Sequence, residues 1–175
     1  QKVQTQLKAN NPVILAMVME KKGSAPRGVG AHMFILSDGS TVDTIGGGPL
    51  EYLAIQEAKQ NIKNGKSIVQ TFSLNNATAG EYGMVCGGQL TVALYCLQQK
   101  DLVQVEKALT LINTKNKIVL SLGWQNENFD FKVYDLAESF ALKEKLTKKS
   151  LLQMDTTNQS GQYLEIMKQS PRVYL

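Results

Sequence analysis

Short apolar runs separated by polar turns dominate the first hundred residues. The run from Val13 to Met19 is continuously apolar, and so short an apolar run predicts a strand that is buried on both faces. A short helix is expected before it, within residues 2–10. Further strands are predicted at residues 33–36, 41–45, 67–74 and 90–97, the first two joined by an Asp-Gly hairpin turn. Pro49 is well placed to begin a helix, whose apolar residues recur at helical spacing as far as Ile62.

The rest of the chain has weaker patterns. Asp101 begins a second predicted helix with one apolar face, and strands are predicted at 117–122 and 129–133. Residues 136–152 have a Lys-rich helical pattern, and 162–167 and 172–175 look extended. Because hairpins are mixed with strand–helix–strand units, we expect an α/β (α+β) fold: a mixed β-sheet flanked by helices, with glycine-rich loops at the strand ends.

Composition narrows the class of protein. The chain has 175 residues, of which 43% are hydrophobic and 19% charged, which fits a globular domain with a small appendage. No apolar run is long enough to span a membrane. The net charge of +4 is divided equally between residues 1–97 and the remainder, so no basic patch points to nucleic acid. The two cysteines, Cys86 and Cys96, match no zinc or redox spacing, so a reducing, cytoplasmic setting is expected.

Three glycine-rich segments, each at a predicted strand end, carry the candidate chemistry: Gly23–Gly30, Gly46–Glu51 and Met84–Gly88. Glycine lets a ligand approach the main chain, and the exposed N–H groups of such loops suit phosphate or carboxylate oxygens. A single loop of this kind is more often only a tight turn, but three in one small domain favour a ligand site. Known nucleotide fingerprints are absent, because Gly65-Lys66-Ser67 lacks the earlier glycine of a P-loop.

Four side chains in or near these segments are candidates, and each has a structural alternative. Arg27 can bind a phosphate through paired hydrogen bonds. Its alternative is a surface position in which it donates hydrogen bonds to loop carbonyl groups. Glu51, at about the third helical position, is favoured as a partner of free helix N–H groups, but it can also accept hydrogen bonds from a heterocycle. Cys86 is favoured as a nucleophile or metal ligand over a small buried hydrophobe. His32, the only histidine, is interpreted as structural.

Together these segments resemble the XdhC/CoxI family, whose members carry G-S-A-P-R, a G-A-x-M strand start, G-G-G-x-L-E and C-G-G in this order. This chain has Gly23–Arg27, Gly30–Met33, Gly46–Glu51 and Cys86–Gly88. The similarity runs from residue 11 to residue 97 of the chain. One departure is Val85, which stands where partners of xanthine dehydrogenase often have a second cysteine, so the client hydroxylase is left open.

The resemblance implies a maturation chaperone rather than an enzyme. Such a protein binds the molybdenum cofactor (molybdopterin) transiently, protects it while its terminal sulfur is installed, and delivers it to the apo-form of a molybdenum hydroxylase such as xanthine dehydrogenase. A homodimer is expected, with a cysteine desulfurase as a further partner. Cys86 is expected to face the metal or its dithiolene. The residues expected to bind the cofactor are Ser24, Arg27, Gly46, Gly47, Gly48, Glu51, Cys86, Gly87 and Gly88.

The expected domain organisation follows the same resemblance. Residues 11–97 are predicted to be the cofactor-binding domain, and residues 98–169 an αβ extension that packs on it. The Pro-Arg-apolar pattern at residues 170–175 resembles the first strand of a Rossmann domain, so a fragment of a longer protein is expected.

Two other functions are kept open. The chain can be a redox or transferase enzyme that acts through Cys86, or an assembly module whose glycine loops dock a partner without any cofactor. The sequence shows no obvious acid/base pair or metal cluster, and this favours the chaperone over the enzyme.

Overall fold

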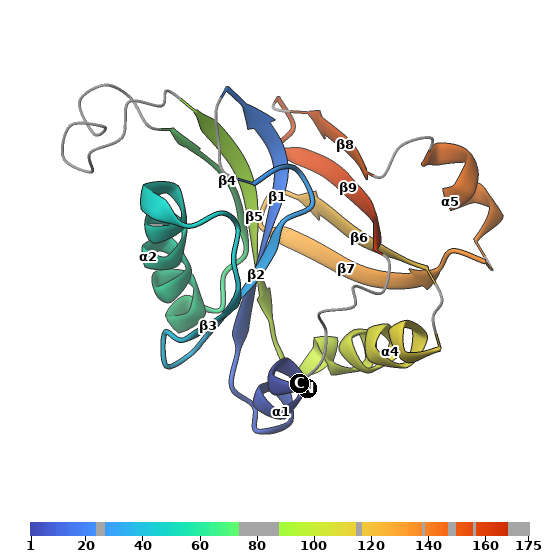
Figure 1. Ribbon diagram of the computed structural model, residues 1–175, viewed down its shortest axis with the longest axis horizontal. Coiled ribbons are helices and arrows are strands. Elements are labelled where there is room, and N and C mark those ends of the chain that lie inside the picture. Colours follow the sequence, from blue (N-terminus) through green and yellow to red (C-terminus); the bar gives the residue numbers. More distant parts are fainter. Residues whose placement is uncertain are drawn as a thin grey trace. The chain divides into compact units, whose positions relative to one another are not determined.

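The computed structural model describes residues 1–23, 27–73, 88–114, 117–137, 139–146, 150–155 and 157–167 (Figure 1). The chain divides into two compact units. One is Ala9–Gln98, here called the glycine-loop unit, because it contains all three glycine-rich segments. The other, here called the second unit, combines Gln1–Lys8 with Gln99–Leu175.

The glycine-loop unit contains a five-stranded sheet in the order β3-β2-β1-β5-β4, in which each neighbouring pair is antiparallel. Helix α2 packs on one face of this sheet, as Figure 1 shows. The elements are β1 (Val13–Lys22), β2 (His32–Leu36), β3 (Thr41–Asp43), α2 (Gly48–Asn64), β4 (Ile68–Ser73) and β5 (Gln89–Leu97).

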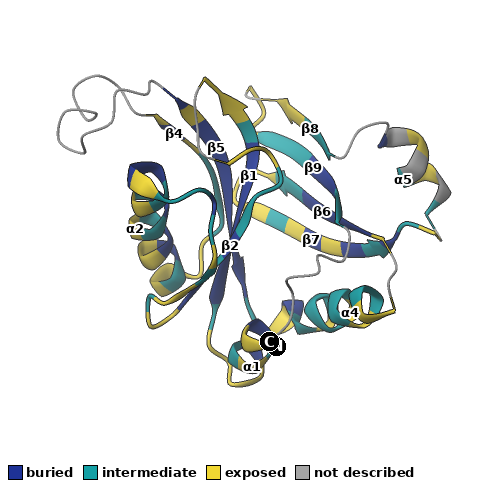
Figure 2. Ribbon diagram, viewed as in Figure 1, coloured by how far each residue is buried: buried dark blue, intermediate teal, exposed yellow. Residues whose placement is uncertain are grey.

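The central strand is buried on both faces, as its continuous apolar run predicts. Every residue from Val13 to Met19 is buried, and β5 is buried from Leu90 to Leu97 (dark blue in Figure 2). The face toward α2 holds Ile14, Ala16 and Val18, which form one cluster with the buried stripe of the helix. That stripe is Leu50, Ala54 and Ala58, whose four-residue spacing places them on one side of the helix.

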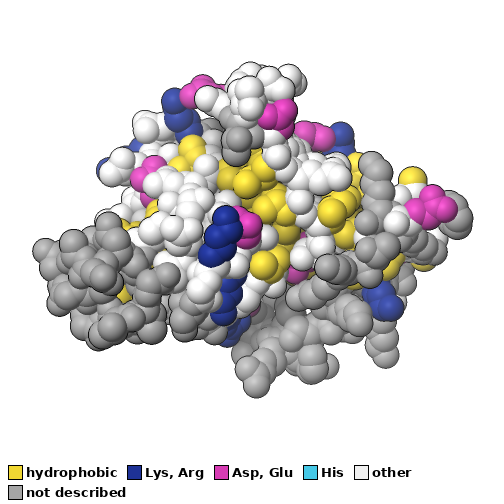
Figure 3. Space-filling model, turned by 90° about the horizontal axis from the view of Figure 1, so that it is seen from above, with side chains coloured by type: hydrophobic (Ala, Val, Ile, Leu, Met, Phe, Trp, Pro, Cys, Tyr) yellow, Lys and Arg dark blue, Asp and Glu magenta, His cyan; other side chains and the backbone are white. Residues whose placement is uncertain are grey.

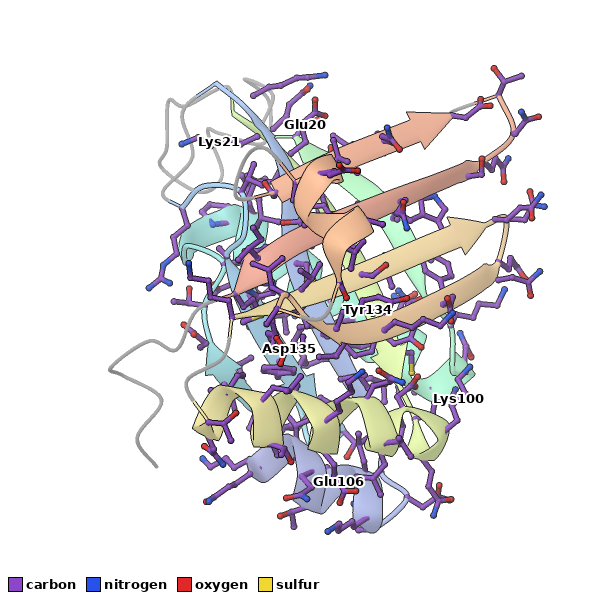
Figure 4. All side chains as sticks on the ribbon, turned by 90° about the vertical axis from the view of Figure 1, so that its right-hand side faces the viewer. Glu20, Lys21, Lys100, Glu106, Tyr134 and Asp135 are labelled. Carbon is purple, nitrogen blue, oxygen red and sulfur yellow. The ribbon has the colours of Figure 1, made fainter. Side chains whose placement is uncertain are left out.

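Pairing with β5 explains why β1 is longer than its apolar run. Glu20, Lys21 and Lys22 are polar but stay in register with the start of β5, beyond a bulge that follows Val18. Figure 4 labels Glu20 and Lys21 at this end of the strand. In contrast, β3 ends earlier than predicted, at Asp43, whose positive φ of 67° turns the chain out of the strand.

The second unit contains a four-stranded sheet in the order β7-β6-β9-β8, again antiparallel throughout. Helix α4 packs on β7 and against α1. Glu106, labelled in Figure 4, joins the two helices through Gln4 Nε2 at 2.9 Å and Lys8 Nζ at 3.0 Å. The elements are α1 (Lys2–Lys8), η1 (Gln99–Asp101), α4 (Leu102–Asn113), β6 (Ile118–Gln125), β7 (Asn128–Asp135), α5 (Phe140–Lys145), β8 (Ser150–Asp155) and β9 (Ser160–Met167).

The predicted α/β class is confirmed, but the described strands form two sheets that are each antiparallel throughout, in place of the one mixed sheet that was expected. The helical pattern at 136–152 gives a helix only at Phe140–Lys145. Its last residues form β8 instead, because Leu151 and Leu152 pair with Leu164 and Tyr163 of β9, a contact that local propensity does not contain. Residues 170–175 lie outside the described part of the chain. No helix in the described part is long and apolar enough to span a membrane.

A glycine in β9 makes the packing of the second unit testable. A Cβ at Gly161 would overlap the ring of Trp124 and lie 2.7 Å from the Gln153 carbonyl oxygen. We expect Gly161→Ala to lower the free energy of unfolding by about 1–3 kcal/mol, because overpacked sites displace their neighbours. Trp124 is the only tryptophan and stacks on Phe129, so its fluorescence reports denaturant unfolding of this unit. The matched control is Gly123→Ala on β6, where an added Cβ meets nothing within 4 Å; equal loss in both variants would contradict the prediction.

Candidate functional site

The three glycine-rich segments leave the sheet at one end. Lys22 at the end of β1 pairs with Gln89 at the start of β5, and Gln89 pairs with Ser73 at the end of β4. The segment that follows Lys22 therefore starts beside both ends of the segment that joins Ser73 to Gln89. The remaining glycine-rich segment, Gly46–Glu51, follows β3, which runs in the same direction as β1 and ends at Asp43, opposite Met33. In Figure 1 this is the end to which the β1 arrow points and at which α2 begins.

A carboxylate organises the turn between β3 and α2. Oε2 of Glu51, from the first turn of α2, accepts hydrogen bonds from the Thr44 hydroxyl at 2.5 Å and from the N–H groups of Ile45 at 2.9 Å and Gly47 at 3.0 Å. The Gly46 N–H donates to Thr44 Oγ1 at 2.9 Å. The side chain of Glu51 thus reaches back over the turn and fixes the backbone that enters the helix.

The shape of this turn requires its glycines. Gly46, Gly47 and Gly48 have φ values of 136°, 72° and 70°, a region in which a Cβ clashes with the backbone. A Cβ at Gly47 would meet no atom within 4 Å, so open space rather than packing lies beside this residue. The glycines therefore provide backbone shape and leave the outer side of the turn accessible.

Hydrogen bonding determines the charge of Glu51. Partial burial raises the pKa of its carboxyl, but the bonds from Thr44 and from the N–H groups of the turn lower it by more, so the net pKa lies below its ordinary value. Glu51 is therefore ionised at neutral pH. Its negative charge is directed at backbone donors and at the positive end of the α2 dipole.

An ion pair joins the first glycine-rich segment to the end of β3. Nη1 of Arg27 lies 3.7 Å from Oδ1 of Asp43, and both side chains are exposed. The same Oδ1 accepts a hydrogen bond from the Thr44 N–H at 2.9 Å. The segment itself is attached to β1 through the Gly30 N–H, which donates to the Val18 carbonyl at 2.9 Å. A cation thus lies next to the residue that leads into the glycine turn.

Polar residues replace the apolar core at this end of the sheet. Thr91 donates to Glu20 at 3.4 Å, and its hydroxyl lies 3.0 Å from that of Thr71, so the three groups form a row across β1, β5 and β4. Lys22 lies 3.7 Å from Glu20. Figure 3, which views the molecule from above, shows a few acidic and basic side chains beside a group of hydrophobic ones.

The structure places only some of the predicted site residues. Arg27, the triple glycine and Glu51 come together around the turn, and Gly88 is buried immediately before β5 at the same end. Ser24, Cys86 and Gly87 lie outside the described residues, so the assignment of Cys86 as a metal ligand stays a prediction. Within the described ranges, no three His, Cys, Asp or Glu side chains are grouped as a metal site would need.

Three residues of this site were missed by the sequence reasoning. Asp43 and Thr44 were assigned to the predicted strand 41–45, yet they are the partners of Arg27 and Glu51. A threonine before the glycines, with a glutamate after them, resembles a capping box and could have suggested the Thr44 contact. Tyr52, which follows the first turn of α2, is 51% exposed, and no sequence pattern marked it.

We expect Glu51→Ala to loosen the turn. The N–H groups of Ile45 and Gly47 would lose their acceptor, at a cost of about 1–3 kcal/mol. Hydrogen exchange of these two amides, followed by NMR, should accelerate in the variant. Glu51→Gln is the isosteric control for charge, and slow exchange of both amides in Glu51→Ala would contradict the assignment.

The stabilisation by Glu51 should also depend on pH. Since the folded-state pKa is lowered, the contribution is complete above the unfolded-state value of 4.5 and is lost as the pH falls through the folded-state value. The difference in unfolding free energy between wild type and Glu51→Gln should therefore shrink on acidification from pH 6 to pH 3. A difference that is constant or grows over this range would exclude the mechanism.

Known proteins that are similar to this chain include a bacterial relative and a solved structure. The uncharacterized protein YqeB of Escherichia coli (strain K12) is 35% identical over 83 residues, which cover 47% of this chain and 15% of YqeB. The other is a solved structure described as a xanthine dehydrogenase from Bacillus halodurans, with a TM-score of 0.65 at 16% identity. It aligns with 94% of this chain, and the chain spans 52% of its length. At this identity the second likeness shows a shared fold.

The segment that contains the site also matches a known family. Residues 6–73 match the model of the XdhC and CoxI family, and this range includes Arg27, the triple glycine and Glu51. Residues 6–73 of the chain are therefore similar to the XdhC and CoxI family.

Proposed function

We propose that this chain is the cofactor-binding part of a maturation chaperone. In this proposal it binds the molybdenum cofactor transiently, protects it, and delivers it to the apo-form of a molybdenum hydroxylase of the xanthine dehydrogenase type. The family of residues 6–73 supports the general role in xanthine dehydrogenase maturation. A homodimer and a cysteine desulfurase partner belong to the same proposal.

The observation that carries the proposal is the Glu51-fixed glycine turn with Arg27 beside it. Three successive residues with positive φ expose the backbone on the outer side of the turn, where Gly47 borders open space. Arg27 is half exposed and contributes a planar fork of donors. A guanidinium next to such a turn suits a phosphate monoester, which the molybdenum cofactor carries at one end.

The other end of the cargo is a planar heterocycle, and Tyr52 offers it a stacking surface. Helical side chains tilt toward the helix N-terminus and lie over the preceding turn. Tyr52 follows Gly48 by four residues at the start of α2, and half of its surface is open to solvent. Offset stacking on an aromatic ring contributes about 0.5–1.5 kcal/mol beyond the buried area.

The site is better suited to binding than to turnover. The cargo itself supplies the molybdenum and its dithiolene, while the chain's residues would hold and orient it. Glu51 is the acidic group on the turn, and its Oε2 is occupied by three donors that favour the ionised form. A carboxylate with a lowered pKa and fixed partners is a poor general acid or base at neutral pH.

We expect Arg27→Ala to weaken cofactor binding by about tenfold or more, since a charge-assisted bond to phosphate is worth about 1.5–3 kcal/mol. The measurement is an anaerobic titration of the chain with purified molybdenum cofactor, followed by the amount of molybdenum that co-elutes with the protein. Lys132→Ala is the matched control, because its side chain is as exposed as that of Arg27 and is also ion-paired.

Stoichiometric binding by wild type and by Lys132→Ala, together with a loss in Arg27→Ala, would support the proposal. No binding by the folded wild-type chain would refute it. Cys86→Ala in the same titration tests the predicted thiol contact separately. If that variant binds as well as wild type, Cys86 does not contact the cofactor.

A further inference from the structure

We infer that Asp43 competes with the bound cargo for Arg27. This competition weakens the binding of the cargo's phosphate by Arg27 and keeps it reversible. The inference rests on the function proposed above, since it concerns the release of the same ligand. It assigns a role to Asp43, which lies at the end of β3 and outside the three glycine-rich segments.

The contact between Arg27 and Asp43 is loose. A single nitrogen faces a single oxygen, and the 3.7 Å between Nη1 and Oδ1 exceeds the length of an N–H···O hydrogen bond. Both side chains are well exposed, at 49% and 62%. Such surface pairs are weak and are further screened by salt. In the described part of the chain, Arg27 therefore has a partner that it can exchange.

Asp43 cannot follow Arg27 when the guanidinium moves. Its backbone pairs with Met33 at the end of β3, and its φ of 67° bends the chain there. Its Oδ1 also accepts the Thr44 N–H at 2.9 Å. The carboxylate thus remains next to the glycine turn whether or not Arg27 is bound to it. The exchange moves only the long side chain of Arg27.

A phosphate monoester is the stronger partner. It has a charge of about −1.5 to −2 near neutral pH and accepts paired hydrogen bonds from guanidinium. A ligand that engages Arg27 must displace Asp43 and then lie near its negative charge. Both effects oppose binding by a modest amount. A carrier that hands its cargo on benefits from this weakening, because dissociation becomes faster.

The test uses inorganic phosphate as the probe and the amide NMR shifts of Gly46, Gly47 and Gly48 as the readout, at constant ionic strength. We expect Asp43→Asn to lower the dissociation constant by about two- to fivefold, the range expected for loss of a surface ion pair. Asparagine tolerates a positive φ and keeps an oxygen for the Thr44 N–H, so the turn should be retained. Equal unfolding midpoints will check this.

Two controls make the outcome specific. Asp130→Asn removes the same charge from another exposed ion pair, with Lys132, and should leave phosphate affinity unchanged. In an Arg27→Ala background, Asp43→Asn should give a clearly smaller gain, because only the repulsion by the Asp43 charge is then removed and no guanidinium is left to release. An equal gain in that background would show simple charge repulsion and overturn the competition.

Weaker phosphate binding in Asp43→Asn would show that Asp43 positions Arg27, and would also overturn the inference. So would the absence of any phosphate response in wild type and variant. These failures are distinct from failure of the proposed function. If wild type binds the molybdenum cofactor but not through Arg27 and Asp43, the chaperone role stands and the inference falls. If phosphate shows the expected pattern but the cofactor does not bind, the proposed function falls.

Discussion

The carboxylate of Glu51 and the backbone donors of the preceding turn form the interaction on which the site depends. Three glycines with positive φ cannot hold a fixed shape by themselves, because glycine has more conformational freedom to lose than any other residue. Three donors converging on one carboxylate oxygen offset that loss. The same bonds keep Glu51 ionised and aligned with the dipole of α2.

The sheet beneath this turn explains why the chain enters and leaves the glycine-rich segments at one end. In an antiparallel sheet the end of one strand lies beside the start of the next, and β1, β4 and β5 meet at Lys22, Ser73 and Gln89. The buried residues of β1 and the stripe of α2 pack together in one core beneath it. The loops can therefore be polar and rich in glycine without contributing to the core.

The electrostatics of the site are balanced rather than strongly positive. Arg27 is close to Asp43, and Lys22 is close to Glu20. The carboxylate of Glu51 accepts hydrogen bonds from the turn. Such a surface suits a modest, exchangeable hold on an anionic ligand more than very tight binding. This is consistent with the proposal that the ligand is cargo and not a resident cofactor. It also gives Asp43 a function that a purely attractive site would lack.

The sequence by itself determined the local elements and the existence of the turn. Continuous apolar residues from Val13 to Met19 required burial on both faces, and the Gly-Gly-Gly-Pro-Leu-Glu segment required a turn into a helix with Glu51 near its start. Only the tertiary structure decided that β8 is a strand, that β1 extends to Lys22, and that Arg27 meets Asp43. The physical reason is the range of the contacts. Capping and periodicity act between residues a few positions apart and can be seen in the sequence, whereas strand pairing and the approach of Arg27 to Asp43 join positions whose proximity is set by the fold.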